Sequence, residues 1–239
     1  MRELAVRDLG RLDYARAFAI QQGLVSRRKL DQIPDQLLFV EHPHTITAGR
    51  NGHPENVLAS PEILERSGIA FHHSDRGGDV TYHGPGQIVG YPILDLRTWK
   101  RDVGAYVRAI ENTLIGTLAD FGIAAERLPG LTGVWAAGEK IAAIGIHISR
   151  WVTSHGFALN LITDLKYFQY IVPCGLTKPV TSMAALGVDA KRGDVVEALT
   201  GHFRRNFDFE ETWDDRRSDA PDGREYRRRY ADQMAEKAG

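Results

Sequence analysis

Three strand-like segments follow one another in the middle of the chain with very little sequence between them. Apolar residues recur with a period of two over 131–137, 141–149 and 152–161, and a turn at Ala137-Gly138-Glu139 joins the first two segments. Connections this short cannot carry the chain back to start a parallel neighbour, so successive strands must run antiparallel. The chain must therefore fold around a sheet with an antiparallel centre.

Helices and other strands surround this centre without alternating strictly. Helices are predicted at 13–29, 61–67, 102–121 and 194–206, and in the third of these Asp102 can cap the start while Gly122 closes the end. Further strands are predicted at 37–40, 45–48 and 89–96, and Pro92 marks the last as an edge strand. We therefore predict an α+β fold, with a mixed, largely antiparallel sheet flanked by helices, over a doubly wound parallel sheet.

The length and composition fit one domain, or at most two closely packed ones, and exclude several classes of function. Hydrophobic residues make up 43% of the 239 residues, and 30 basic against 31 acidic residues leave a formal charge of −1. This balance gives no electrostatic basis for binding nucleic acid or an anionic membrane. Because no apolar run is long enough for a bilayer and the first residues lack a signal or transit pattern, we expect a cytoplasmic protein.

The sequence changes character near its C-terminal end. From 210 to 239 it is highly charged, with DDRR at 214–217 and RRR at 227–229. Such blocks bury too little apolar surface to order themselves. We predict one domain over 1–209 and a solvated tail over 210–239 that carries no chemistry.

Cys174 is the single cysteine, which excludes an intrachain disulfide and any zinc or iron–sulfur site built on several cysteines. The nine histidines do not reproduce a known ligand spacing, so no metal site is predicted. Pro173 and Gly175 flank Cys174, as in a surface turn, although a lone cysteine is commonly a small buried apolar residue. The thiol is therefore either a reactive surface group or a structural one.

Lys140 opens the apolar strand at 141–149. Strict alternation places its side chain on the same buried face as Ala142 and Ile144, whereas a register shift at the preceding turn directs it to the other face. A lysine on a buried face is unusual unless it has a partner or a task. Both orientations remain open from the sequence.

A glycine-rich segment, RGGDVTYHGPGQ, occupies 76–87. Glycine removes side-chain bulk and allows a backbone to lie directly against a ligand. The segment lacks the Gly-Lys-Ser/Thr ending of a phosphate-binding P-loop and the GxGxxG spacing of dinucleotide sites. An irregular turn is the alternative, but the polar side chains among the glycines favour contact with a ligand.

This segment resembles the signature of the lipoyl(octanoyl) transferases. Three more strings agree with that family in order and spacing: KIAAIGI at 140–146, HGFALN at 155–160 and IVPCG at 171–175. The stretch from Glu41 to Arg50, which begins with EHP and ends with GR, is similar to the family as well. The resemblance runs from about residue 4 to 207 and leaves the charged tail outside.

The resemblance implies a fold shared with the catalytic domains of biotin and lipoate protein ligases. It also implies a catalytic dyad of Cys174 and Lys140, and it carries substrate-contacting positions over to three segments. These positions are Arg76, Gly77, Gly78, Asp79, Val80, Thr81, Tyr82, His83, Ala143, Ile144, Gly145, Gly156, Phe157 and Ala158.

The same resemblance implies an acyltransferase reaction. The enzyme would move an octanoyl or lipoyl group from acyl carrier protein to a lysine of lipoyl domains, through a thioester on the cysteine, in the first step of endogenous lipoate attachment. The acceptors would be the lipoyl domains of 2-oxoacid dehydrogenases and the glycine cleavage H protein. No cofactor is expected, because exchange of one thioester for another needs no ATP.

Three other functions remain to be separated from this one. An ATP-dependent lipoate or biotin ligase would share the fold but would need no cysteine. A thiol amidotransferase would use the same dyad with a lipoyl domain as donor. A non-catalytic acyl- or cofactor-binding module would keep its ligand after Cys174→Ala. Small residues on neighbouring strands, Ala143, Gly145, Gly156 and Ala158, further suggest the wall of a channel for an alkyl chain.

Overall fold

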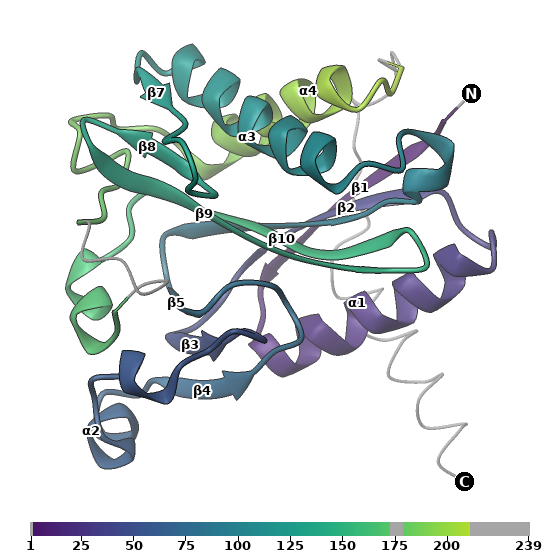
Figure 1. Ribbon diagram of the computed structural model, residues 1–239. Coiled ribbons are helices and arrows are strands. Elements are labelled where there is room, and N and C mark those ends of the chain that lie inside the picture. Colours follow the sequence, from purple (N-terminus) through teal and green to yellow (C-terminus); the bar gives the residue numbers. More distant parts are fainter. Residues whose placement is uncertain (1, 173–178, 211–239) are drawn as a thin grey trace, which may run out of the picture.

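The computed structural model describes residues 2–172 and 179–210, and these build a layered α+β domain (Figure 1). A seven-stranded sheet forms the middle layer. Helices α3 (Val103–Asp120) and α4 (Arg192–Asn206) cover one face, while α1 (Tyr14–Lys29) and a small three-stranded sheet lie against the other. The predicted fold class is confirmed.

The large sheet is mixed, and most of its strand pairs are antiparallel, as predicted. Only the first pair, β1 with β2, is parallel, and every other neighbouring pair is antiparallel. The order across the sheet is β1 (Leu4–Arg11), β2 (Asp35–Glu41), β6 (Gln87–Ile93), β10 (Val152–Asn160), β9 (Glu139–Ser149), β8 (Val134–Ala136) and β7 (Ala125–Glu126).

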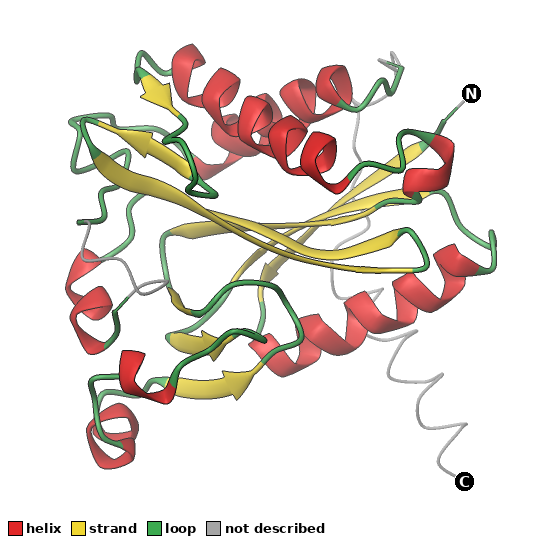
Figure 2. Cartoon of the chain, in the orientation of Figure 1, coloured by secondary structure: helices red, strands yellow, loops and turns green. Residues whose placement is uncertain are grey.

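The small sheet places β3 (Thr45–Ala48) between β4 (Ala70–His73) and β5 (Val80–His83), as the yellow arrows at the lower left of Figure 2 show. Short helical segments occupy the connections around it. They are η1 (Pro54–Asn56), α2 (Pro61–Arg66) and η3 (Leu165–Tyr170), whereas η2 (Leu96–Thr98) lies between β6 and α3.

The helix ends follow the capping chemistry of the sequence. Asp102 accepts a hydrogen bond from the Ala105 N–H at the start of α3, and Gly122 takes a positive φ of 76° just after its end. Asp13 caps α1 in the same way through the Arg16 N–H. The predicted helices at 13–29, 61–67, 102–121 and 194–206 are thus confirmed to within two residues.

The edge-strand prediction for Pro92 is wrong, because β6 lies inside the sheet between β2 and β10. The ladder between β6 and β10 reaches only Gly90 and Phe157. Beyond that point the Thr153 hydroxyl donates to the Pro92 carbonyl and accepts from the Leu94 N–H, both at 2.8 Å. A side chain thus supplies hydrogen bonds that the backbone ladder does not make beside the proline.

Four strands escaped prediction, and one of them is the two-residue β7 at the sheet edge. β1 is half-buried and charged at several positions, β4 is mostly exposed, and β5 lies inside the glycine-rich segment. No helix in 2–172 and 179–210 is long and apolar enough to span a bilayer. The predicted tail at 210–239 lies outside the described residues apart from Glu210.

A stability test follows from the close approach of β10 to β6 at Gly156. A Cβ on Gly156 would lie 2.2 Å from the Gly90 carbonyl oxygen and 2.5 Å from Pro92 Cδ. We expect Gly156→Ala to lower the free energy of unfolding by about 1–3 kcal/mol in urea titrations, because backbone atoms must move. Gly193→Ala, on α4 with open space around it, is the control and should be neutral or slightly stabilising. Equal midpoints for Gly156→Ala and wild type would contradict the close approach.

Candidate functional site

Two adjoining pockets lie between the large sheet and the small one. The larger, here called the groove, encloses about 460 Å³ and is open to solvent. Its lining residues are Tyr14, Arg76, Gly78, Thr81, His83, Val89, Tyr91, Ala143, Ile144, Gly145, His155, Gly156, Phe157 and Ala158.

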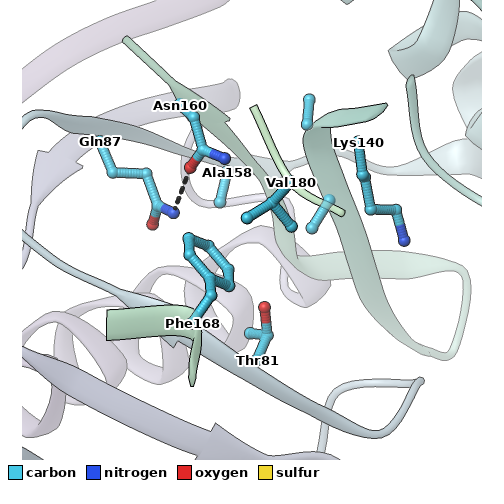
Figure 3. Close-up of a pocket in the computed structure, with 9 residues that line it drawn as sticks. Thr81, Gln87, Lys140, Ala158, Asn160, Phe168 and Val180 are labelled. Carbon is cyan, nitrogen blue, oxygen red and sulfur yellow. Dashed lines mark hydrogen bonds between the residues drawn. The ribbon is translucent and has the colours of Figure 1, made fainter. Parts of the chain in front are cut away.

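The second pocket, here called the Lys140 pocket, encloses about 330 Å³ and appears in Figure 3. It shares Thr81, Ala143 and Ala158 with the groove, so the two pockets adjoin. Its lining residues are Thr81, Gln87, Lys140, Ala142, Ala143, Ala158, Asn160, Phe168 and Val180.

The four small residues suggested as a channel wall lie opposite one another on two paired strands. Ala143 of β9 pairs with Ala158 of β10, and Gly145 pairs with Gly156. All four line the groove. Since neither glycine carries a side chain, the sheet surface is bare at this level.

The glycine-rich segment is tied down over this bare surface. The Gly77 N–H donates to the Ile146 carbonyl of β9 at 2.7 Å. The Arg76 guanidinium is 6% exposed and donates to the Thr47 carbonyl at 2.6 Å and to the Gly77 carbonyl at 3.1 Å. Arg76 therefore holds the segment against β3 as well as lining the groove.

Alternation along β5 divides the predicted contact residues. Thr81 and His83 face the groove, whereas Val80 and Tyr82 pack into the core of the small sheet. Asp79 accepts hydrogen bonds from the His53 N–H and the Asn56 side-chain amide and so holds the neighbouring loop. Of the predicted contact residues, Gly77, Asp79, Val80 and Tyr82 do not line either pocket.

The floor of the groove is aromatic, which the sequence analysis missed. The Tyr14 ring lies parallel to His83, with ring centroids 6.4 Å apart, and the His155 ring stacks on Phe18 at 5.5 Å. Tyr91 closes the floor beside His155. The helical position of Tyr14 and Phe18, four residues apart on one face of α1, was the available signal.

Two histidines near the groove are neutral at physiological pH. Burial lowers the pKa of His83 to about 3 and that of His42 to about 4. His83 Nδ1 lies 2.9 Å from Gln87 Oε1, and His42 Nε2 lies 2.8 Å from the Tyr91 hydroxyl. The groove is therefore lined by uncharged imidazole at its centre.

His155 lines the groove near the end of β10 that is opposite Asn160. Its ring is hydrogen-bonded to an acidic partner. Its Nε2 is 2.6 Å from Asp75 Oδ1. Burial lowers the pKa of His155 in spite of this carboxylate. For Asp75, burial alone would raise the pKa, but the hydrogen bond from His155, the nearby charges of His155 and His147 and a backbone hydrogen bond together lower it. The pair therefore holds a neutral ring and an ionised carboxylate at pH 7.

Lys140 is 8% exposed at the start of β9. The strand bulges at Ile141, because Ala142 pairs with Val134 while Lys140 pairs with Trp135. Val134 packs into the core under α3 and α4, so its neighbour Trp135 and the paired Lys140 face the other way. A register shift therefore occurs, but at this bulge and not at the preceding turn, where Ala136 pairs with Glu139, and the side chain is nonetheless buried.

The stem and the head of Lys140 each have a contact. A Cβ on Gly133 would lie 2.8 Å from Lys140 Cε, so the stem packs on the Gly133 backbone. The ammonium lies 5.0 Å from the centre of the Trp135 ring and is directed away from Gln87 and Asn160 in Figure 3. Cys174 lies outside the described residues, which resume at Pro179 beside the Lys140 backbone.

The low pKa of His83 predicts an acid-sensitive fold. The unfolded chain binds a proton at this position below about pH 6.5 and the folded chain does not until about pH 3. Stability contributed by His83 is therefore complete above pH 6.5 and falls as the pH drops from there toward 3. We expect His83→Gln to reduce the stability lost between pH 7.5 and 5.5 by about 1 kcal/mol in urea titrations. Parallel pH slopes for both proteins would refute this.

Comparison with known proteins agrees with the geometry. The family described as the lipoyl protein ligase A/B catalytic domain matches residues 13–204. An octanoyltransferase of Solibacter usitatus is 68% identical over 210 residues, which cover 88% of this chain and 96% of that protein. Another, of Koribacter versatilis, is 52% identical and covers 86% of this chain and 83% of its own.

The fold has solved relatives as well. A bipartite lipoate protein ligase of Thermoplasma acidophilum, studied with its E2 lipoyl domain, superposes with a TM-score of 0.73 at 16% identity, covering 89% of this chain and 86% of that one. This likeness establishes the shared fold of lipoate ligases. With the match over 13–204 and the 68% identity, it leads to one conclusion: the chain belongs to the lipoyl protein ligase A/B catalytic domain family and, within it, to the octanoyltransferases.

Proposed function

We propose that this octanoyltransferase moves an octanoyl group from the thioester of acyl carrier protein to a lysine of a lipoyl domain, with Cys174 as the intermediate carrier. The observation that carries the proposal is a buried lysine at one end of a channel walled by small residues. The 68% identity to an octanoyltransferase, over nearly all of both chains, supports the same reaction.

The first half-reaction is an exchange of thioesters. The Cys174 thiolate attacks the carbonyl carbon of the octanoyl donor, a new S–C bond forms, and the bond to the pantetheine sulfur breaks. Lys140, as an ammonium, gives a proton to the departing thiolate and favours the ionised form of Cys174. Because one thioester replaces another, no ATP is required.

The second half-reaction makes an amide. The ε-amine of the acceptor lysine attacks the enzyme-bound thioester, the C–N bond forms, and Cys174 leaves as a thiolate. The neutral Lys140 amine takes the proton that the attacking amine loses. Conversion of a thioester to a more stable amide draws the reaction forward.

The groove suits the hydrocarbon part of this substrate. An octanoyl chain is uncharged, and each buried CH₂ contributes roughly 0.8 kcal/mol to binding. The paired Ala143 and Ala158, followed by Gly145 and Gly156, leave a smooth wall leading away from the Lys140 pocket. We infer that the chain lies along this wall with its thioester end near Lys140.

Lipoyl domains are the proposed acceptors. The Thermoplasma acidophilum ligase with the same fold was studied with its E2 lipoyl domain. We extend the proposal to the lipoyl domains of 2-oxoacid dehydrogenases and to the glycine cleavage H protein, with acyl carrier protein as donor and the cytoplasm as the site of action.

Intact-protein mass spectrometry tests the covalent intermediate. After mixing with octanoyl–acyl carrier protein and no ATP, the wild type should gain one octanoyl group that hydroxylamine removes, because a thioester is labile to that nucleophile. Cys174→Ala should gain none. Activity of Cys174→Ala that depends on ATP would instead identify a ligase, and transfer only from octanoylated lipoyl domains would identify an amidotransferase.

The role of Lys140 in proton transfer is tested by the pH dependence of Lys140→Ala. A lower thiol pKa gains little by itself, since a less basic thiolate is a poorer nucleophile, with a Brønsted slope of about 0.4–0.5. We therefore expect the variant to stay at least about 100-fold slower than wild type even at pH 9, in line with general acid–base contributions. Recovery of near-wild-type turnover at pH 9 would show that Lys140 only supplies thiolate.

A further inference from the structure

Two buried amides stand beside Lys140 that the proposed chemistry does not use. Gln87 follows the glycine-rich segment and is 2% exposed, and Asn160 ends β10 and is 4% exposed. Gln87 Nε2 donates to Asn160 Oδ1 at 2.9 Å, the dashed line in Figure 3. Both line the Lys140 pocket. Amides buried to this degree are stable only when their hydrogen bonds are made, so those bonds fix how each one points.

The orientation of each amide is set by its partners. Gln87 Oε1 accepts from His83 Nδ1 at 2.9 Å, and Gln87 Nε2 also reaches the Tyr82 carbonyl at 3.3 Å. Turning this amide over would exchange donor for acceptor at every contact. With Asn160 Oδ1 accepting from Gln87, Asn160 Nδ2 is directed at the Thr181 carbonyl, 2.9 Å away.

Thr181 in turn is bonded to the Lys140 backbone. The Thr181 N–H donates to the Lys140 carbonyl at 3.0 Å, and the Lys140 N–H donates to the Pro179 carbonyl at 2.9 Å. The Met183 N–H donates to the Asn160 carbonyl at 3.0 Å. Hydrogen bonds thus hold the segment 179–183 to Asn160 on one side and to the Lys140 backbone on the other.

We propose that Gln87 and Asn160 are positioning residues, which hold the Lys140 backbone at the pocket through the segment 179–183. The inference rests on the proposed function, because it assigns these amides to the acyl transfer in which Lys140 takes part. On the β10 side of β9 the regular ladder ends at the pair of Ala142 with Leu159, and beyond it Lys140 pairs with Val180 of the 179–181 segment. Without it, the Lys140 backbone would lose the hydrogen bonds that hold it at the pocket.

Single-turnover acylation of Cys174 by octanoyl–acyl carrier protein tests the proposal. Asn160→Ala should slow the acylation rate constant about 10- to 100-fold with KM little changed, since small displacements of a catalytic group have effects of this size. Gln87→Ala should act in the same direction, as a second variant on the same amide pair. Asn206→Ala is the matched control: Asn206 donates to the His202 carbonyl at 2.8 Å on α4, and its loss should leave the rate unchanged.

A double-variant cycle and hydrogen exchange separate positioning from general destabilisation. In the Lys140→Ala background, Asn160→Ala should add almost nothing, because both act through one ammonium. Exchange of the Lys140 and Thr181 amides should speed up in Asn160→Ala and not in Asn206→Ala.

Effects that multiply in the double variant, or unchanged exchange at Lys140 and Thr181, would overturn the positioning role. Loss of acylation in Lys140→Ala with a wild-type rate in Asn160→Ala would overturn this inference alone. A wild-type rate in Lys140→Ala itself would overturn the proposed role of Lys140 and this inference with it.

Discussion

The pairing of Gly145 with Gly156 is the constraint on which the rest of the site depends. Where these residues oppose each other on β9 and β10, neither strand carries a side chain. A Cβ on Gly145 would lie 3.0 Å from the Gly77 carbonyl oxygen, and one on Gly156 would collide with the Gly90 carbonyl. The glycine-rich segment can therefore approach the face of the sheet, and β6 can lie close beside β10. The groove is the space that this bare patch leaves.

The groove and the Lys140 pocket differ in their electrostatics in a way that suits an acyl thioester. Apart from Arg76, whose guanidinium donates to the Thr47 and Gly77 carbonyls, the groove is lined mainly by alanine, glycine, tyrosine and histidines such as His83 that burial keeps neutral. An alkyl chain placed there displaces water from apolar surface and separates no charges. At the other end, the Lys140 ammonium lies against the Trp135 ring. In the reaction proposed above, this charge lies at the end where bonds would form and break.

Local patterns predicted the helices, the antiparallel centre and the small-residue wall, because capping, periodicity and residue size are properties of short segments. Lys140 shows where this stops: its face depends on a bulge at Ile141, and a bulge is set by the pairing of β9 with β8. Pro92 shows the same limit, since the hydrogen bonds beside this interior proline come from the side chain of Thr153, 61 residues away.

Family resemblance predicted the glycine-rich segment as one continuous contact surface, but alternation along β5 turns every second residue away. Val80 and Tyr82 contribute to the core, and Thr81 and His83 reach the groove. The aromatic floor from α1 was missed for the opposite reason: Tyr14 and Phe18 read as ordinary amphipathic helix residues until the fold places them under the channel. Gln87 and Asn160 stood at the ends of recognised strings, yet their connection to Thr181 required three separated segments to meet.

The large sheet ends at β7, a strand of only two residues, and at its other border β1 carries Arg7, Asp8 and Arg11. Asp8 is paired with Arg192 of α4. Unpaired backbone groups on a long, flat, apolar border would template the addition of foreign chains. Here β7 is too short to support a further ladder, and β1 carries several charged side chains. These two borders thereby disfavour self-association of the protein by strand addition to its large sheet.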